Sequence, residues 1–107
     1  MHRGFYVTAR AGDAVIWLAG PYPTVQRAWE RRRHAIALFM AQAPHVPLEA
    51  FGVSNMATLD DRTPLPAGAL NNEMGERYWS DEAGRLYCSH GLILYGTQCV
   101  TCEREAL

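Results

Sequence analysis

Two proline-containing runs bracket the one segment of this chain that can form a long helix. The Gly-Pro-Tyr-Pro run at positions 20–23 interrupts any regular element before it, and Pro44 and Pro47 end any helix that reaches them. Between the two runs, Thr24 is a good N-cap and the residues that follow are rich in helix formers. We therefore predict one main helix over Val25–Ala43, around which the rest of the chain must be arranged.

The segments on either side of this helix have the composition of β-strands. Phe5–Arg10 and Ala14–Ala19 are aromatic and β-branched runs separated by a short Gly-containing turn, which predicts a hairpin. Leu48–Asn55 predicts a third strand after the helix. The order β-β-α-β predicts an α+β fold, in which a small antiparallel sheet carries one main helix.

The second half of the chain is less regular. Residues 57–76 contain prolines and glycines without periodicity, which predicts a connector loop of a kind that is usually functional or poorly ordered. Residues 77–80 and 85–88 flank a Gly-containing turn and predict a second hairpin, and residues 92–95 predict a further short strand. We treat residues 1–107 as a single domain: a β-β-α-β module (1–56), the connector, and a C-terminal β-hairpin tail (77–107) resembling a zinc ribbon.

The charged residues are nearly balanced, with 10 basic and 11 acidic residues and a formal net charge of -1. This balance argues against a nucleic-acid-binding protein whose affinity rests on bulk positive charge. The distribution is nevertheless uneven: residues 1–56 contain six arginines and three acids, and residues 57–107 contain four arginines and eight acids. Either the two halves attract each other within one domain, or the basic half presents a face to an anionic partner.

The sequence shows no signal peptide and no apolar run of membrane-spanning length. We therefore expect a cytoplasmic protein that does not engage a membrane. Because thiols stay reduced in the cytoplasm, a cysteine cluster there is a better candidate for a metal site than for disulfides.

Three cysteines and one histidine near the C-terminus have the spacing of a metal site. Cys99 and Cys102 form a C-x2-C pair, and Cys88 and His90 form a tighter pair eleven residues earlier. Thiolate and imidazole groups from two such pairs suit the tetrahedral geometry of structural zinc. The sequence thus predicts a zinc site made by Cys88, His90, Cys99 and Cys102.

Other interpretations of this cluster stay open. The alternatives are buried, unligated thiols with His90 exposed, a redox pair of Cys99 and Cys102, and adventitious disulfides. If zinc binds, its role is structural, because four protein ligands leave no position for water. A zinc deaminase is disfavoured, because Leu92 stands where the deaminase pattern, with its His-x-Glu, has glutamate.

On a helical wheel, at about 100° per residue, the predicted helix has an apolar stripe that faces a core. The stripe comprises Val25, Ala28, Trp29, Ile36, Phe39, Met40 and Ala43. Arg32 falls near the middle of it. Either the Arg32 stem covers the edge of the core and its head reaches water or an acid such as Glu49, or Arg32 and Trp29 belong to an interface.

Arg27, Arg31 and His34 fall on the opposite side of the helix, which is either a solvated face or a phosphate-binding patch together with Arg3 or Arg10. The adjacent acids Asp81 and Glu82 are expected to be solvated turn residues rather than a catalytic pair. No motif of a known enzyme class is present, so we predict no catalytic residues.

Several segments of the first half resemble a recurring pattern in small uncharacterised proteins of proteobacterial plasmids, integrative elements and phages. The matching segments are Phe5-Tyr6-Val7-Thr8, Gly20-Pro21-Tyr22-Pro23-Thr24, the arginine-bearing helix and Ala50-Phe51-Gly52-Val53. The resemblance covers residues 4–55. It implies a mobile-element protein, and such proteins, when they lack enzymatic motifs, often bind and inhibit host machinery, as anti-CRISPR proteins do.

The first functional hypothesis is therefore a non-enzymatic mobile-element protein that binds a host protein or nucleoprotein, as an anti-defence inhibitor. Its predicted contact residues are Arg27, Trp29, Arg31 and Arg32, together with the connector. The alternative is a small zinc-stabilised regulator that binds nucleic acid through Arg3, Arg10, Arg27 and Arg31. An enzyme with a zinc or thiol centre is a third, weaker hypothesis.

Overall fold

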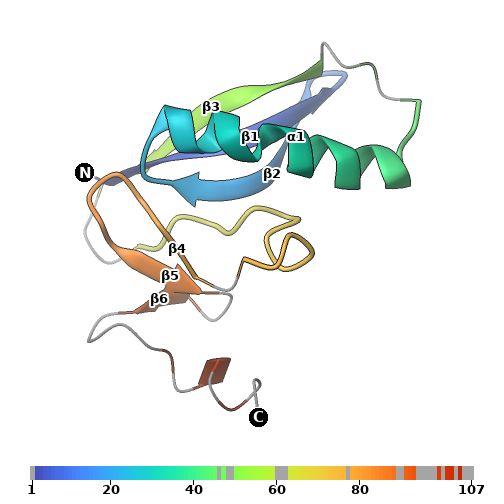
Figure 1. Cartoon of the computed structure of the whole chain (residues 1–107). Helices are drawn as coiled ribbons and strands as arrows, with labels where there is room; N and C mark the ends of the chain where they lie inside the picture. The colour runs from blue at the N-terminus through green and yellow to red at the C-terminus, as the bar shows by residue number, and fades with distance from the viewer. Residues whose placement is uncertain are drawn as a thin grey trace.

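The computed structural model describes residues 2–45, 47, 50–59, 63–76, 78–88, 91–93, 99, 101–102 and 104, and it has the predicted α+β fold. Its elements are β1 (His2–Ala11), β2 (Ala14–Tyr22), α1 (Val25–Gln42), β3 (Phe51–Thr58), β4 (Tyr78–Ser80), β5 (Leu86–Cys88) and β6 (Gly91–Ile93). The strands form two antiparallel sheets, in the orders β2-β1-β3 and β4-β5-β6. Figure 1 shows α1 along one face of the larger sheet, and the smaller sheet beyond β2.

The first hairpin is confirmed, but the prediction that residues 20–23 end its second strand is wrong. The strand β2 continues through Gly20 and Pro21 to Tyr22, which pairs with Phe5 of β1. Proline has no backbone N–H, so it cannot donate the hydrogen bonds that a central strand makes to both of its neighbours. Pro21 is tolerated because β2 is an edge strand of its sheet.

The third strand, β3, spans Phe51–Thr58 and so begins and ends about three residues later than the predicted range of 48–55. It pairs with β1 without a register shift, from Phe51 opposite Ala9 to Thr58 opposite His2. This register places Phe51 and Val53 in the core beneath α1, so packing rather than local composition sets its limits. Leu48 lies outside the described residues.

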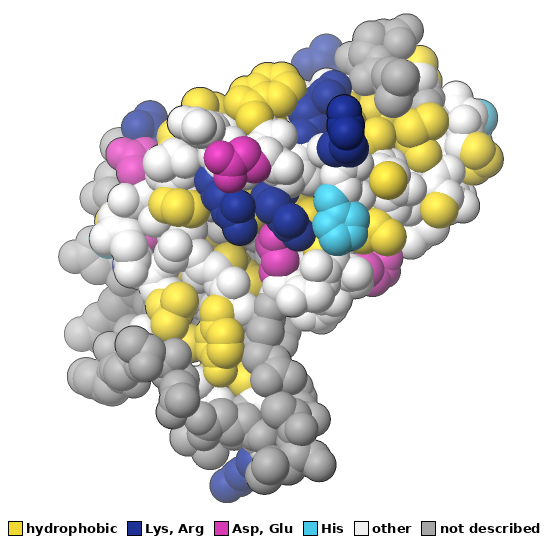
Figure 2. Space-filling view, in the orientation of Figure 1, with side chains coloured by type: hydrophobic (Ala, Val, Ile, Leu, Met, Phe, Trp, Pro, Cys, Tyr) yellow, Lys and Arg dark blue, Asp and Glu magenta, His cyan; other side chains and the backbone are white. Residues whose placement is uncertain are grey.

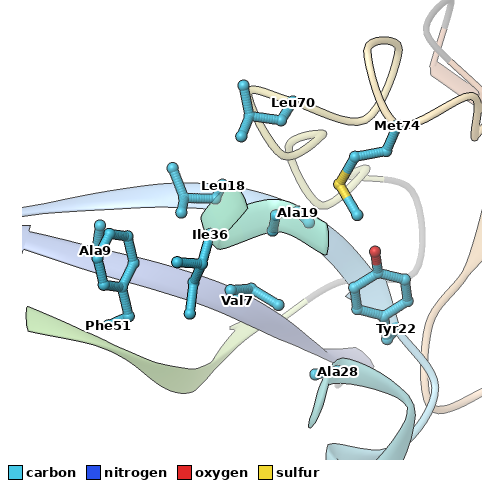
Figure 3. Packing of buried hydrophobic residues seen from close by; sticks show 11 residues of the cluster. Val7, Ala9, Leu18, Ala19, Tyr22, Ala28, Ile36, Phe51, Leu70 and Met74 are labelled. Carbon is cyan, nitrogen blue, oxygen red and sulfur yellow. The ribbon is translucent and has the colours of Figure 1, made fainter. Parts of the chain in front are cut away.

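The main core lies between α1 and the larger sheet. Thr24 caps the helix as predicted, since the backbone N–H of Arg27 donates to its Oγ1 at 3.0 Å. The buried helix residues are Ala28, Ala35 and Ile36. They belong to a cluster with Val7, Ala9, Leu18, Ala19, Tyr22, Phe51, Leu70 and Met74, and Figure 3 shows most of this cluster.

The connector, predicted to be either functional or poorly ordered, is hydrogen-bonded to β2 in its middle part. The backbone N–H groups of Gly68, Ala69 and Leu70 donate to carbonyls of β2. The side chain of Asn71 accepts a hydrogen bond from the backbone N–H of Gly20 at 3.0 Å and donates one to its carbonyl at 2.6 Å. This segment therefore closes the outer edge of β2 in place of a fourth strand.

The two halves of opposite charge attract each other, as one of the two interpretations expected. Arg3 pairs with Glu82 and Arg31 pairs with Glu76, each at 2.7 Å. The smaller sheet also packs against the larger one through a second, small core of Leu65, Trp79 and Tyr87, with Met56 of β3 against it.

Candidate metal centre and interaction face

The short central strand of the smaller sheet positions the first cysteine. Cys88 is the last residue of β5, where it pairs with Tyr78 of β4 on one side and with Gly91 of β6 on the other. Two neighbouring strands thus fix its backbone, and its side chain is buried.

The other two cysteines come from the end of the chain. The backbone N–H of Cys99 donates to the hydroxyl of Tyr78 at 3.4 Å, which ties it to β4. Cys102 lies in a helical turn and is buried. The sulfur atoms of Cys88, Cys99 and Cys102 all lie within 4.8 Å of one another. The structure therefore brings together three of the four predicted ligands, and His90 lies outside the described residues.

The local electrostatics favour a cation between these sulfurs. A hydrogen bond from the backbone N–H of Cys102 lowers the pKa of Cys99 to about 6. Burial raises the pKa of Cys102 to about 12, with a further contribution from its thiol neighbours. The surroundings thus favour the thiolate form at Cys99 more than at Cys102, and a bound metal ion would replace the remaining thiol protons.

The spacing of the sulfurs fits a metal ion. Zinc–sulfur bonds of about 2.3 Å place tetrahedral thiolates roughly 3.8 Å apart. The three sulfurs, at 4.8 Å or less, are within about 1 Å of that arrangement. None of the cysteines forms a disulfide. The cluster can hold a metal ion.

Sequence reasoning missed a buried ionic network beside this centre. Asp81, expected to be solvated, is 0% exposed. Its carboxylate accepts hydrogen bonds from Arg85 Nε and from the Tyr87 hydroxyl, both at 2.7 Å, and from the Arg85 backbone N–H at 2.9 Å. Only the hairpin geometry, which returns residues 85 and 87 to residue 81, reveals this role.

The network also joins the smaller sheet to the larger one. The guanidinium of Arg85 donates to Oγ1 of Thr58, at the end of β3, and to the carbonyl of Thr63. Burial by itself would raise the pKa of Asp81, but the hydrogen bonds from Tyr87 and Arg85 outweigh it, so the pKa of Asp81 lies below its usual value. The network thus connects the hairpin of the smaller sheet to the end of β3 and to the connector.

The four predicted contact residues of α1 lie on two different flanks of the helix. Arg27 is exposed and pairs with Glu30 at 3.2 Å. Arg31 is partly buried, because its Nε donates to Glu76 at 2.7 Å and Glu76 also accepts from the Tyr22 hydroxyl. Figure 2 shows positive side chains gathered over this side, with acidic and histidine side chains among them. Arg31 therefore links α1 to the connector through Glu76.

The other flank carries Trp29 and Arg32. Trp29, assigned from the sequence to the core-facing stripe, is 53% exposed. The guanidinium of Arg32 lies over its ring, 5.2 Å from the centroid. The Arg32 Nε atom is buried, and within the described residues it has no hydrogen-bond partner. The acid suggested as a partner for Arg32, Glu49, lies outside the described residues.

A groove of about 520 Å³ opens between the first turns of α1 and β4. Its wall on the helix side includes Arg27 and Glu30, and the opposite wall includes Tyr78 and Trp79. Because the charges in it pair with each other or with Arg31, the groove has no net charge that would select an ion.

Comparisons with protein-family models, with curated proteins and with solved structures find no match to this chain. In the part of the chain that the structure describes, no helix has the length and apolar character needed to cross a membrane.

Proposed function

We propose that this protein is a non-enzymatic binding protein whose smaller sheet is held by a structural zinc ion. The Trp29–Arg32 flank of α1 contacts the partner, a host protein or nucleoprotein. The observation that carries this proposal is the exposure of Trp29 with Arg32 stacked on it. Tryptophan and arginine are the residues most enriched at the centres of protein interfaces.

Within this proposal, two of the four predicted contact residues are favoured over the others. Arg31 already neutralises Glu76, and Arg27 faces the groove with Glu30. Trp29 and Arg32 are consequently the primary contacts, and Arg27 has a peripheral role. The mobile-element pattern in residues 4–55 supports a host target and an anti-defence, anti-CRISPR-like role for the complex.

A pull-down from a proteobacterial lysate with matched variants tests the binding surface. The wild-type chain should retain a partner that Trp29→Ala and Arg32→Gln each lose. Arg104→Gln removes another exposed arginine, far along the sequence from the flank, and should retain the partner. Equal recovery with all four proteins, or recovery of nothing by the wild type, would refute the proposal.

We further propose that the metal is zinc, bound by Cys88, Cys99 and Cys102 with His90 as the fourth ligand. Three thiolates and one imidazole are a common structural zinc set. Zinc here would stabilise a small sheet that buries little apolar surface of its own.

Elemental analysis of the purified protein tests the metal. One zinc ion per chain is expected, and Cys102→Ser and His90→Ala should each lower that stoichiometry. His45→Ala is the matched control, because His45 is an exposed histidine elsewhere in the sequence. A wild-type protein purified with zinc present but containing none would exclude the site.

The structure offers little support for the alternative hypothesis of a nucleic-acid-binding regulator. Three of its four predicted arginines, Arg3, Arg27 and Arg31, have carboxylate partners within the chain. Such pairing reduces the charge that phosphates would otherwise attract.

A further inference from the structure

The two outer edges of the larger sheet differ. The edge of β2 is covered by residues 68–71, as described above. The strand β3, on the other edge, pairs with β1 along its length. Among the residues that the structure describes, no backbone group outside β1 is hydrogen-bonded to Gly52–Ala57. Figure 1 shows β3 along the margin of the molecule.

This open edge lacks the features that usually prevent strand pairing. Edge strands are commonly protected by charged residues, by proline or by a bulge. The sequence of β3, FGVSNMAT, has no charge and no proline. Its register with β1 is continuous over eight pairs, whereas the β1–β2 register shifts twice. The edge of β3 is therefore a regular template for an added strand.

The Trp29–Arg32 flank lies on the β3 side of α1. Ala28 and Ala35 face the sheet, and Arg31 turns toward Glu76, which is bonded to the end of β2. Successive residues on a helix are about 100° apart, so Trp29 lies about 160° around the helix from Arg31. Arg32 lies between Trp29 and the sheet-facing Ala28. The T-shaped contact of Phe39 with Phe51 shows that α1 also reaches β3.

The charge near the outer edge of β3 indicates which kind of segment would bind there. Among the residues that the structure describes, neither β3 nor the helix positions on this flank include an acidic residue, and no carboxylate pairs with Arg32. A second copy of the chain, paired through β3 about a twofold axis, would place its own Arg32 on the same side, and its β3 would supply no carboxylate. A strand that carries carboxylates would satisfy the site.

We propose that the outer edge of β3 binds an extended acidic segment of the partner protein by strand addition. The segment's backbone pairs with Gly52–Ala57, one carboxylate meets Arg32, and an apolar side chain packs on Trp29. This inference rests on the proposed function, since it specifies how the same flank engages its partner. Backbone pairing gives affinity and alternate side chains give specificity in this mode of recognition.

Nuclear magnetic resonance of the full-length, nitrogen-15-labelled protein tests the proposal with a defined probe. The probe is a capped nine-residue peptide in which threonine alternates with glutamate and valine. It should shift the amide signals of β3 and the indole signal of Trp29. A glutamine-for-glutamate peptide and Arg32→Gln should each weaken binding about tenfold or more.

Backbone methylation of the peptide separates strand addition from side-chain contact alone. Methylation of the N–H groups on one edge of the peptide should abolish the β3 shifts, and methylation on the other edge should leave them. Equal binding by both methylated peptides, shifts confined to the groove beside β4, or no shift at millimolar peptide would overturn the proposal.

Three further outcomes have distinct meanings. Shifts in β3 that depend on protein concentration without peptide would assign the edge to a second copy and refute the acidic segment. If the pull-down still depends on Trp29 and Arg32 while the peptide fails, strand addition is wrong and the proposed function stands. If the peptide binds while the pull-down fails, the host partner is wrong.

Discussion

The larger and the smaller sheet are stabilised by different means. The larger sheet and α1 enclose a continuous apolar cluster to which strands, helix and connector all contribute. The smaller sheet has three-residue strands, a core of three buried side chains, a buried ionic network and three clustered cysteines. A sheet this small buries too little apolar area to be stable alone, and polar networks or metal ions compensate in such cases.

Metal removal should give the largest difference between the two regions. If zinc links Cys88 to Cys99 and Cys102, a chelator should release the end of the chain and raise amide hydrogen exchange in β5 and β6. Exchange in β1 and α1 should stay nearly unchanged, because their packing does not involve the cysteines. Hydrogen exchange with mass spectrometry measures this, and uniform loss of protection would show that the sheets unfold as one unit.

Loss of the buried carboxylate should cost the smaller sheet more than any exposed substitution. Asp81→Asn removes the buried carboxylate that pairs with the guanidinium of Arg85, which is 11% exposed. We expect a loss of about 3–5 kcal/mol in the free energy of unfolding, measured by urea denaturation. Glu82→Gln, in the same turn but in an exposed pair, is the control and should cost about 1 kcal/mol or less. Similar losses for both would contradict the buried network.

A cavity in the main core should lower the free energy of unfolding by a similar amount to the loss of Asp81, but through lost apolar packing alone. Leu18 is fully buried at the register shift of β2, and Leu18→Ala should cost about 2–5 kcal/mol. Val15→Ala, on the same strand but 43% exposed, should cost less than about 1 kcal/mol. Urea denaturation monitored by tryptophan fluorescence measures both, and a small effect at Leu18 would mean that the core repacks.

Low pH should destabilise the smaller sheet by protonating Asp81. This is the smallest of the four predicted effects. An Asp pKa of about 3.9 applies in the unfolded chain, and the pKa of Asp81 in the folded protein lies below it. The contribution of Asp81 is therefore complete above about pH 5 and is lost as the pH falls through the folded-state pKa. The stability difference between wild type and Asp81→Asn should shrink below about pH 4, and a constant difference from pH 6 to pH 2 would exclude this linkage.

Local signals in the sequence determined the order of elements, the hairpin turn and the capped helix. Thr24, the glycine in the first turn and the prolines act on their nearest neighbours, so they can be interpreted without knowing the fold. The same is true of the cysteine spacing, because a C-x2-C pair needs only a local turn to converge. Those predictions agree with the structure with two exceptions. The strand β2 continues through Gly20 and Pro21 to Tyr22, and His90 lies outside the described residues.

The tertiary structure alone decided which side chains are buried or paired across the chain. Trp29 fits an apolar stripe, yet it lies beyond the edge of the surface that the sheet covers. Asp81 has the local context of a solvated acid, but the hairpin folds Arg85 and Tyr87 over it. Asn71 becomes a substitute for a strand only when the connector meets β2. Such roles depend on partners far apart in the sequence or on the limits of a surface, which no local pattern encodes.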